Sequence, residues 1–190
     1  MKKIIAGVDE VGRGSLIGPV YSAAVILNNK INKKKLKDSK KLSKKNREIL
    51  EKYIKKNSFW AIGSASLIEI EKINILNASL LAMKRAIKKL KKKPQLVLID
   101  GNKIPIISNY RLKSIIKGDQ KIPEISAASI IAKVSRDRLI AKISKKFNRY
   151  SWDKNAGYGT KYHIAAIKKF GITKHHRKNF QPVYNILSHK

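Results

Sequence analysis

Four of the twelve acidic residues share one setting in the sequence: each follows a short apolar run and lies beside or near a glycine. These residues are Asp9, Glu10, Asp100 and Asp119. The carboxyl ends of strands in α/β proteins form the edge where ligands bind, so we expect the four side chains to meet there. Carboxylate oxygens in this number suit Mg²⁺ or Mn²⁺. Two such ions about 4 Å apart can activate water for cleavage of a phosphodiester.

Each of these positions also has a simpler explanation. Asp100-Gly101 is a common turn dipeptide, and Asp119 precedes a segment with a helical pattern, where a capping role is ordinary. Asp9 and Glu10 raise a further difficulty, because neighbouring side chains on a regular strand point to opposite faces. For both to serve one site, we expect the backbone to leave strand geometry at this pair.

The elements that must position the carboxylates are predicted from hydrophobic periodicity and helix caps. Ser43 is a candidate N-cap, Pro123 suits a first helical turn, and Gly171 is a C-terminal stop. The order of elements predicts an α/β fold with a mixed β-sheet flanked by helices. We expect strands at 4–8, 19–27, 59–66, 95–99 and 114–116, helices at 43–56, 67–72, 76–92, 122–147 and 160–170, a loop at 150–160 and a weakly patterned end at 179–190.

Composition indicates a single domain over residues 1–190 that attracts polyanions. The chain carries 44 basic and 12 acidic residues, a formal charge of +32, which favours salt-dependent binding to nucleic acid. Of the basic residues 36 are Lys, so a coding bias toward A and T, or merely solvated helix faces, competes with that explanation. The chain has no cysteine, no bilayer-length apolar run and no signal-peptide core, which favours a soluble cytoplasmic protein without a membrane partner.

Five segments, in this order, resemble the motifs of ribonuclease HII, the type 2 ribonucleases H. The resemblance extends from residue 4 to about residue 180, and five spaced motifs are far more specific than one glycine-rich loop. Type 3 relatives carry an additional N-terminal substrate-binding domain; here the first motif begins within ten residues of the start, so we expect type 2. The segments are GVDEVGRGSLIGPV at 7–20, DSKKL at 38–42, LIDG at 98–101, KGD at 117–119 with SAASIIAKVSRD at 126–137, and GYGT at 157–160 with His163 after it.

The resemblance implies a ribonuclease H-like fold with a small C-terminal helical extension, about residues 148–190, that contributes to substrate binding. It also implies an endonuclease, most simply a monomer, with Asp9, Glu10, Asp100 and Asp119 as catalytic ligands of Mg²⁺ or Mn²⁺, two ions during catalysis. The family cuts the phosphodiester on the 5′ side of a ribonucleotide and leaves a 3′-hydroxyl and a 5′-phosphate. Its substrates are RNA/DNA hybrids and single ribonucleotides embedded in duplex DNA, which places it in ribonucleotide excision repair.

The resemblance also assigns residues that contact the substrate. The turn formed by Gly12, Arg13 and Gly14 matches the segment that reads the ribose 2′-hydroxyl, the group that separates RNA from DNA. Tyr158 matches a tyrosine that packs on the next sugar, although a tyrosine between glycines can also simply anchor a loop. Surface solvation is the ordinary alternative for basic residues at helical spacing. Residues that could hold backbone phosphates are Lys40, Lys41 and Arg136.

The sequence departs from the family pattern in a few places. Val11 stands for the usual alanine and Ser15 for the usual proline. The segment 175–180 only partly matches the family's basic Arg-Ser-Phe-like stretch, which leaves its contribution open. We assign no metal to the adjacent His175 and His176, because two histidines without partners make a poor metal site.

Two other functions compete with this interpretation. A non-enzymatic binder, such as a ribosome-associated protein, suits the size and charge but leaves the four carboxylates unexplained. A nuclease of related fold that acts on all-DNA substrates, such as a junction resolvase, is separated from the first interpretation by a duplex that lacks any 2′-hydroxyl.

Overall fold

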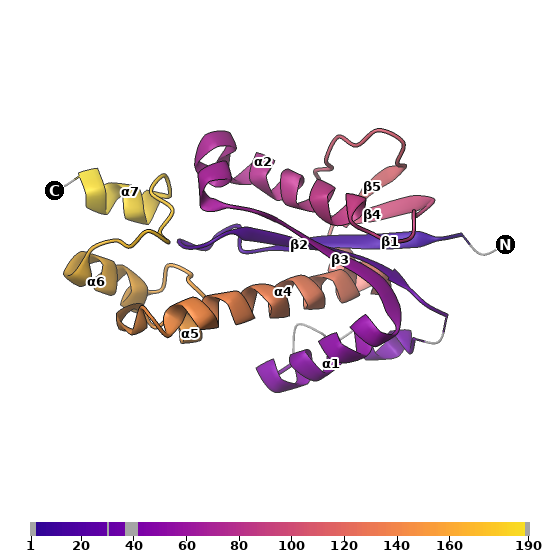
Figure 1. Cartoon of the computed structure of the whole chain (residues 1–190), viewed down its shortest axis with the longest axis horizontal. Helices are drawn as coiled ribbons and strands as arrows, with labels where there is room; N and C mark the ends of the chain where they lie inside the picture. The colour runs from indigo at the N-terminus through magenta and orange to yellow at the C-terminus, as the bar shows by residue number, and fades with distance from the viewer. Residues whose placement is uncertain (1–2, 30, 37–41, 189–190) are drawn as a thin grey trace.

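A computed structural model describes residues 3–29, 31–36 and 42–188, and its centre is a five-stranded mixed sheet (Figure 1). The strand order is β3-β2-β1-β4-β5. The first three strands pair antiparallel, whereas β4 pairs parallel to β1 and β5 parallel to β4. The predicted mixed α/β sheet is therefore confirmed. The strands are β1 Ile5–Val11, β2 Val20–Leu27, β3 Ser58–Ala65, β4 Leu96–Asp100 and β5 Leu112–Ile115.

Helices cover both faces of the sheet and one of its ends. In Figure 1, α2 lies over one face, α1 and α4 lie over the other, and α5, α6 and α7 gather beyond the end toward which β1 runs. Among the described residues, no helix combines the length and the apolarity needed to cross a bilayer. The helices are α1 Lys44–Lys56, α2 Leu67–Lys88, α3 Gly118–Lys121, α4 Pro123–Ser144, α5 Trp152–Asn155, α6 Lys161–Phe170 and α7 Gln181–Ser188, with 3₁₀ turns at Lys33–Leu36 and Asn148–Tyr150.

Most predicted elements are confirmed because their signals are local. The Ser43 side chain accepts from the Asn46 N–H at the start of α1, and Pro123 lies in the first turn of α4. Gly171 ends α6 with a φ of 78°. The motif at 38–42 that contains Lys40 and Lys41 lies outside the described residues, except for Leu42.

Other predictions need correction. The two helices expected at 67–72 and 76–92 form α2, which is interrupted only at Asn74, where φ is 62°. The expected loop at 150–160 contains a 3₁₀ turn and α5, and the weakly patterned end contains α7. The helix α7 escaped prediction because it is short and Val183 is its one buried residue among those described, in a cluster that also contains Leu16 and Ile17 from far earlier in the sequence.

One very close contact between helix and sheet lies where α4 crosses β1. A Cβ atom added to Gly7 would lie 2.0 Å from the backbone carbon of Glu124, so the start of α4 rests directly on the strand. The apolar side chains Ala127, Ala128 and Ile131 follow on the same helix and are fully buried. The absence of a side chain at residue 7 therefore allows α4 to pack directly against the strand that carries Asp9.

Replacement of Gly7 by alanine should destabilise the protein by about 3 kcal/mol, because the new methyl group overlaps rigid backbone. Chemical unfolding at equilibrium measures this change. Gly14→Ala is the matched control, since its added Cβ would lie no closer than 3.8 Å to the Tyr158 ring. Equal stability of the Gly7→Ala protein and the wild type would contradict the close contact.

Candidate active site

Parallel pairing of β1 with β4 brings Asp9 and Asp100 to the same edge of the sheet. The last registered pair is Val8 with Ile99, so the two aspartates come next on neighbouring strands. Both lie on the α4 face: Asp9 shares it with Gly7, and Asp100 points toward Gly118 just before α4. The negative charge of Asp100 contributes to raising the pKa of Asp9.

Asp119 reaches this edge through a tight turn before α3. Lys117 adopts a left-handed conformation with φ of 55°, which directs the Gly118 N–H to the Asp100 carboxylate. The distance from the Gly118 nitrogen to Asp100 Oδ1 is 2.7 Å, and Asp119 follows as a buried residue. The hydrogen bond thus joins the segment bearing Asp119 to the strand bearing Asp100.

Glu10 lies on the opposite face of β1 from Asp9. The expectation that the backbone leaves strand geometry here is wrong, because β1 continues to Val11 with Glu10 registered against Ser22. The Asp9 carboxylate instead bends along the strand and accepts the Glu10 N–H at 2.7 Å. The Asp100 charge nevertheless contributes to raising the pKa of Glu10, and Glu10 forms an ion pair with Arg13 at 3.1 Å.

Burial and mutual repulsion make the ionised carboxylates costly. Desolvation, then the neighbouring Glu10 and Asp100 charges, raise the pKa of Asp9 to about 8, against a partly opposing hydrogen bond from Ser129. Desolvation also raises the pKa of Glu10, although Arg13 opposes that shift. Divalent cations relieve both penalties and match hard oxygen donors, so this donor set fits them.

The four carboxylates do not surround a common point in the way that the ligands of one metal ion do. Within the described part of the chain, no three His, Cys, Asp or Glu side chains close around a common point. Glu10 pairs with Arg13, Asp100 Oδ1 accepts the N–H groups of Gly101 and Gly118, and Asp9 accepts the Glu10 N–H.

The Gly12–Gly14 turn and Tyr158 lie side by side next to the carboxylates. Ser15 forms an isolated β-bridge with Tyr158, and the Leu16 N–H donates to the Gly157 carbonyl at 2.8 Å. The Tyr158 ring, which is 36% exposed, lies over Gly14. An aromatic surface and an open backbone turn therefore face solvent together.

Arg136 corrects a prediction. It is fully buried, and its guanidinium donates to the carbonyls of Ile17, Pro19 and Ala156 at 3.0–3.3 Å. A Cβ atom on Gly12, whose φ is 91°, would overlap its Nε at 2.2 Å. Neither direct phosphate contact nor surface solvation suits such a residue; it braces the turn from inside.

Arg177 is a second buried arginine that sequence reasoning missed. Its Nε donates to Gly18 O at 2.9 Å and its Nη1 to Arg13 O at 2.8 Å. Burial and the charge of Arg136 lower its pKa to about 9. Its position in the partly matching basic segment was the only signal in the sequence.

A buried histidine pair supports Tyr158 from behind. His163 Nδ1 lies 3.0 Å from the Tyr158 carbonyl, while its Nε2 accepts from Trp152 Nε1 at 2.9 Å. His176 Nε2 lies 3.3 Å from His163 Nε2, so His176 does have a partner, contrary to expectation. These contacts are consistent with a neutral His163 that donates to the Tyr158 carbonyl, and desolvation lowers the pKa of both histidines.

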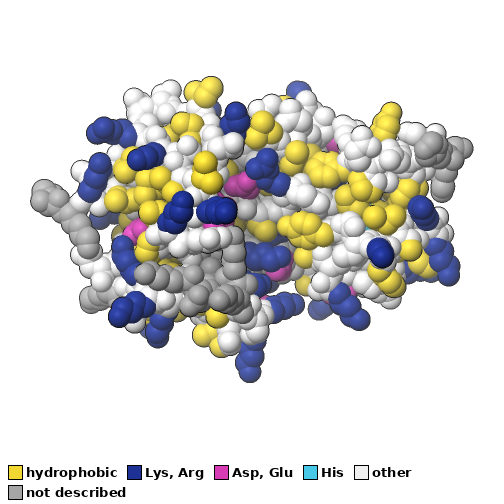
Figure 2. All heavy atoms as spheres, turned by 180° about the vertical axis from the view of Figure 1, so that it is seen from behind, with side chains coloured by type: hydrophobic (Ala, Val, Ile, Leu, Met, Phe, Trp, Pro, Cys, Tyr) yellow, Lys and Arg dark blue, Asp and Glu magenta, His cyan; other side chains and the backbone are white. Residues whose placement is uncertain are grey.

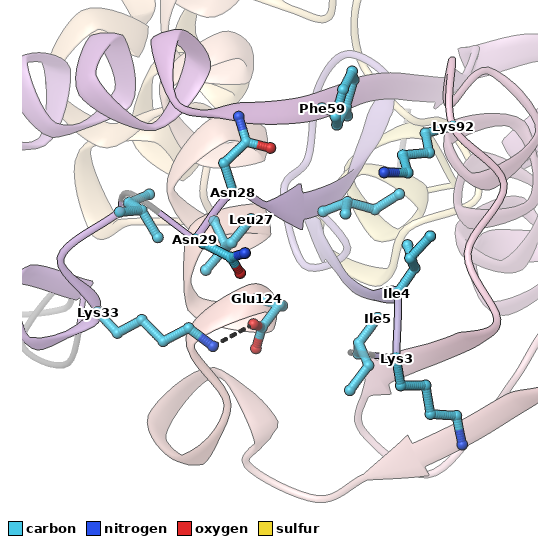
Figure 3. Close-up of a pocket in the computed structure, with 12 residues that line it drawn as sticks. Lys3, Ile4, Ile5, Leu27, Asn28, Asn29, Lys33, Phe59, Lys92 and Glu124 are labelled. Carbon is cyan, nitrogen blue, oxygen red and sulfur yellow. Dashed lines mark hydrogen bonds and ion pairs between the residues drawn. The ribbon is translucent and has the colours of Figure 1, made fainter. Parts of the chain in front are cut away.

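A pocket of about 480 Å³ lies away from the carboxylates (Figure 3). The start of β1 at Ile4 and Ile5 and the end of β2 at Leu27 line it, so it occupies the opposite end of these strands from Asp9. The Lys33–Glu124 ion pair spans one side at 2.8 Å. None of the predicted site residues lines this pocket.

A mixed sheet of this order, with Asp9 and Asp100 at the ends of the neighbouring strands β1 and β4, fits a nuclease of the ribonuclease H class. A family model for ribonuclease HII matches residues 6–183. The chain is 75% identical over 185 residues to Ribonuclease HII of Pelagibacter ubique, which covers 97% of this chain and 100% of that protein. The crystal structure of ribonuclease H2 from Pyrococcus horikoshii OT3 has a TM-score of 0.81 and 26% identity, with 97% of each chain covered. Ribonuclease HII of Coxiella burnetii is 52% identical over 181 residues, 95% of this chain and 89% of that one. The chain belongs to the ribonuclease HII family, and it is an enzyme.

Asp9→Asn should stabilise the metal-free protein by roughly 1–3 kcal/mol at pH 8. The folded pKa of Asp9 lies above its ordinary value, so the ionised side chain costs stability that grows as pH rises from about 4 to about 8. Thermal unfolding in a chelator measures the gain. Added Mg²⁺ should stabilise the wild type more than the variant.

The matched control is Asp137→Asn, which removes only a partly exposed ion pair with Lys133 and should change stability by about 0.5 kcal/mol at most. A variant at residue 9 that is less stable than the wild type in chelator would contradict the cost assigned to this carboxylate.

Proposed function

We propose that this enzyme hydrolyses the phosphodiester on the 5′ side of ribonucleotides, in RNA/DNA hybrids and at single ribonucleotides embedded in duplex DNA. The products carry a 3′-hydroxyl and a 5′-phosphate. The observation that carries this proposal is the crowding of Asp9, Asp100 and the Asp119 segment at one sheet edge, with the Gly12–Gly14 turn beside it. Ribonucleotide excision repair is the process that such an activity serves.

Asp9, Glu10, Asp100 and Asp119 would hold Mg²⁺ or Mn²⁺, two ions during catalysis. The ions would activate a water molecule and stabilise the leaving oxygen. The chain itself fixes the carboxylates: Ser129 holds Asp9, and the Gly101 and Gly118 amides hold Asp100. Glu10 and Arg13 keep each other oriented next to the turn.

The Gly12–Gly14 turn supplies backbone groups to the ribose 2′-hydroxyl, and Tyr158 packs on the following sugar. The closeness of the Tyr158 ring to Gly14 supports this division of roles, because one nucleotide step can then contact both. The C-terminal helical part, about residues 148–190, contributes to substrate binding by carrying Tyr158.

The surface suits a polyanionic duplex without identifying a single groove. Figure 2 shows Lys and Arg side chains scattered over the whole of one face, with few Asp and Glu among them. Lys40 and Lys41 stay candidates for phosphate contacts. We also propose that the enzyme acts as a monomer in the cytoplasm, with nucleic acid as its partner.

Asp119→Asn should lower the cleavage rate at least about 100-fold, because it weakens a metal ligand. The assay is nicking of a DNA duplex with one embedded ribonucleotide, with Mg²⁺ or Mn²⁺ titrated from zero. Duplex affinity should change less than about threefold, since phosphate contacts dominate affinity. Asp153→Asn is the matched control.

An all-DNA duplex of the same sequence belongs in this assay. Cleavage of that duplex at a comparable rate would replace the proposed function with that of a nuclease indifferent to ribose. Near-normal nicking by the Asp119→Asn protein would instead contradict the metal-site assignment.

Tyr158→Ala should slow cleavage at an isolated ribonucleotide by about tenfold, the order expected when one stacking contact is lost. Cleavage within a long RNA strand of a hybrid should fall less, because a deoxynucleotide does not follow each cut. Tyr162→Ala, an exposed tyrosine on α6, is the control. Equal losses on both substrates would argue against a role at the junction.

A further inference from the structure

Two buried arginines lie behind the turn that faces the substrate. Arg136 and Arg177 are both 0% exposed, yet neither forms an ion pair with a carboxylate within the described part of the chain. Burial of a guanidinium without a carboxylate costs free energy. This cost indicates that the position of the backbone carbonyls bound by these two arginines matters for function. Those carbonyls belong to residues 13 and 17–19 and to Ala156.

The hydrogen bond from Arg177 to Arg13 fixes the direction of one peptide group. Arg177 Nη1 donates to Arg13 O at 2.8 Å and thereby draws this carbonyl toward the interior. In a trans peptide the N–H points opposite to the carbonyl, so the Gly14 N–H points away from Arg177. No acceptor for that N–H exists among the described residues, and the Gly14 position is open apart from the Tyr158 ring at 3.8 Å.

The same guanidinium ties the turn to the strand that follows it. Arg177 Nε donates to Gly18 O, the Arg177 N–H donates to Leu16 O, and Ile17 forms a β-bridge with His176. Its Nη2 is buried and has no partner among the described residues. An unsatisfied buried donor costs about 1–3 kcal/mol. A shorter side chain would avoid this cost, but it would not reach both the Arg13 and the Gly18 carbonyls.

We propose that Arg177 is a positioning residue for ribose recognition: by holding the Arg13 and Gly18 carbonyls inward, it presents the Gly14 N–H to the substrate sugar. Arg177 does not itself touch the substrate. The inference rests on the proposed function. It means that a residue near the C-terminal end of the fold helps the turn at residues 12–14 to select a ribonucleotide.

The test compares Arg177→Met with the wild type in nicking of the duplex that carries one ribonucleotide. An all-DNA duplex serves as competitor, so that KM reports recognition of the ribonucleotide and Ki reports binding that ignores it. The positioning role predicts that KM rises about tenfold, the size of a lost hydrogen bond, while Ki changes less than twofold. A purely structural role would lower only the apparent kcat, through loss of folded enzyme.

Arg85→Met is the matched control, because Arg85 also donates to a carbonyl, that of Ser64, but lies on α2 and pairs with Glu69. Its KM and Ki should match those of the wild type. Arg177→Lys keeps the charge but cannot span both carbonyls as a fork, so it should raise KM by an intermediate factor. If Arg177→Met does not fold, Arg177→Lys decides by the same ratio.

The outcomes separate the two proposals. Wild-type enzyme that does not distinguish the two duplexes would overturn the proposed function. Wild-type enzyme that distinguishes them, together with Arg177 variants whose ratio of Ki to KM is unchanged, would overturn the positioning role alone.

Discussion

The cost of crowding negative charge at a partly buried sheet edge governs the arrangement of this protein. Asp9 bears that cost most heavily, because burial and two neighbouring carboxylates oppose its ionisation. The parallel pairing of β1 with β4 and the left-handed turn at Lys117 both act to maintain the crowding. A fold under selection for stability alone would separate these charges. A divalent cation would relieve this repulsion.

The turn that follows β1 has buried positive charge beneath it instead. Two guanidinium groups are buried there, and within the described ranges their hydrogen bonds go to backbone carbonyls, while Arg177 Nη2 has no partner. Negative charge at the strand ends and positive charge beneath the turn meet at the same end of β1, although the residues that carry them are far apart in the sequence.

Local signals made most of the fold predictable. Ser43, Pro123 and Gly171 act as expected because caps and stops depend on neighbouring residues. Strand alternation correctly predicted that Asp9 and Glu10 point to opposite faces, but the expectation that the backbone leaves strand geometry at this pair was wrong, because β1 continues to Val11. The roles of Arg136 and Arg177 could not be predicted, since the carbonyls that they bind lie as far as 164 residues away in sequence.

The bracing of the first turn by the last part of the chain has a consequence for synthesis. Residues 12–18 are translated well before Tyr158 and Arg177, which hold them, and 164 residues separate Arg13 from Arg177. Contacts of such sequence separation form late, after the loop between them has closed. A nascent chain can thus assemble its sheet before the turn at residues 12–18 is braced, because the bracing waits until Arg177 has been translated.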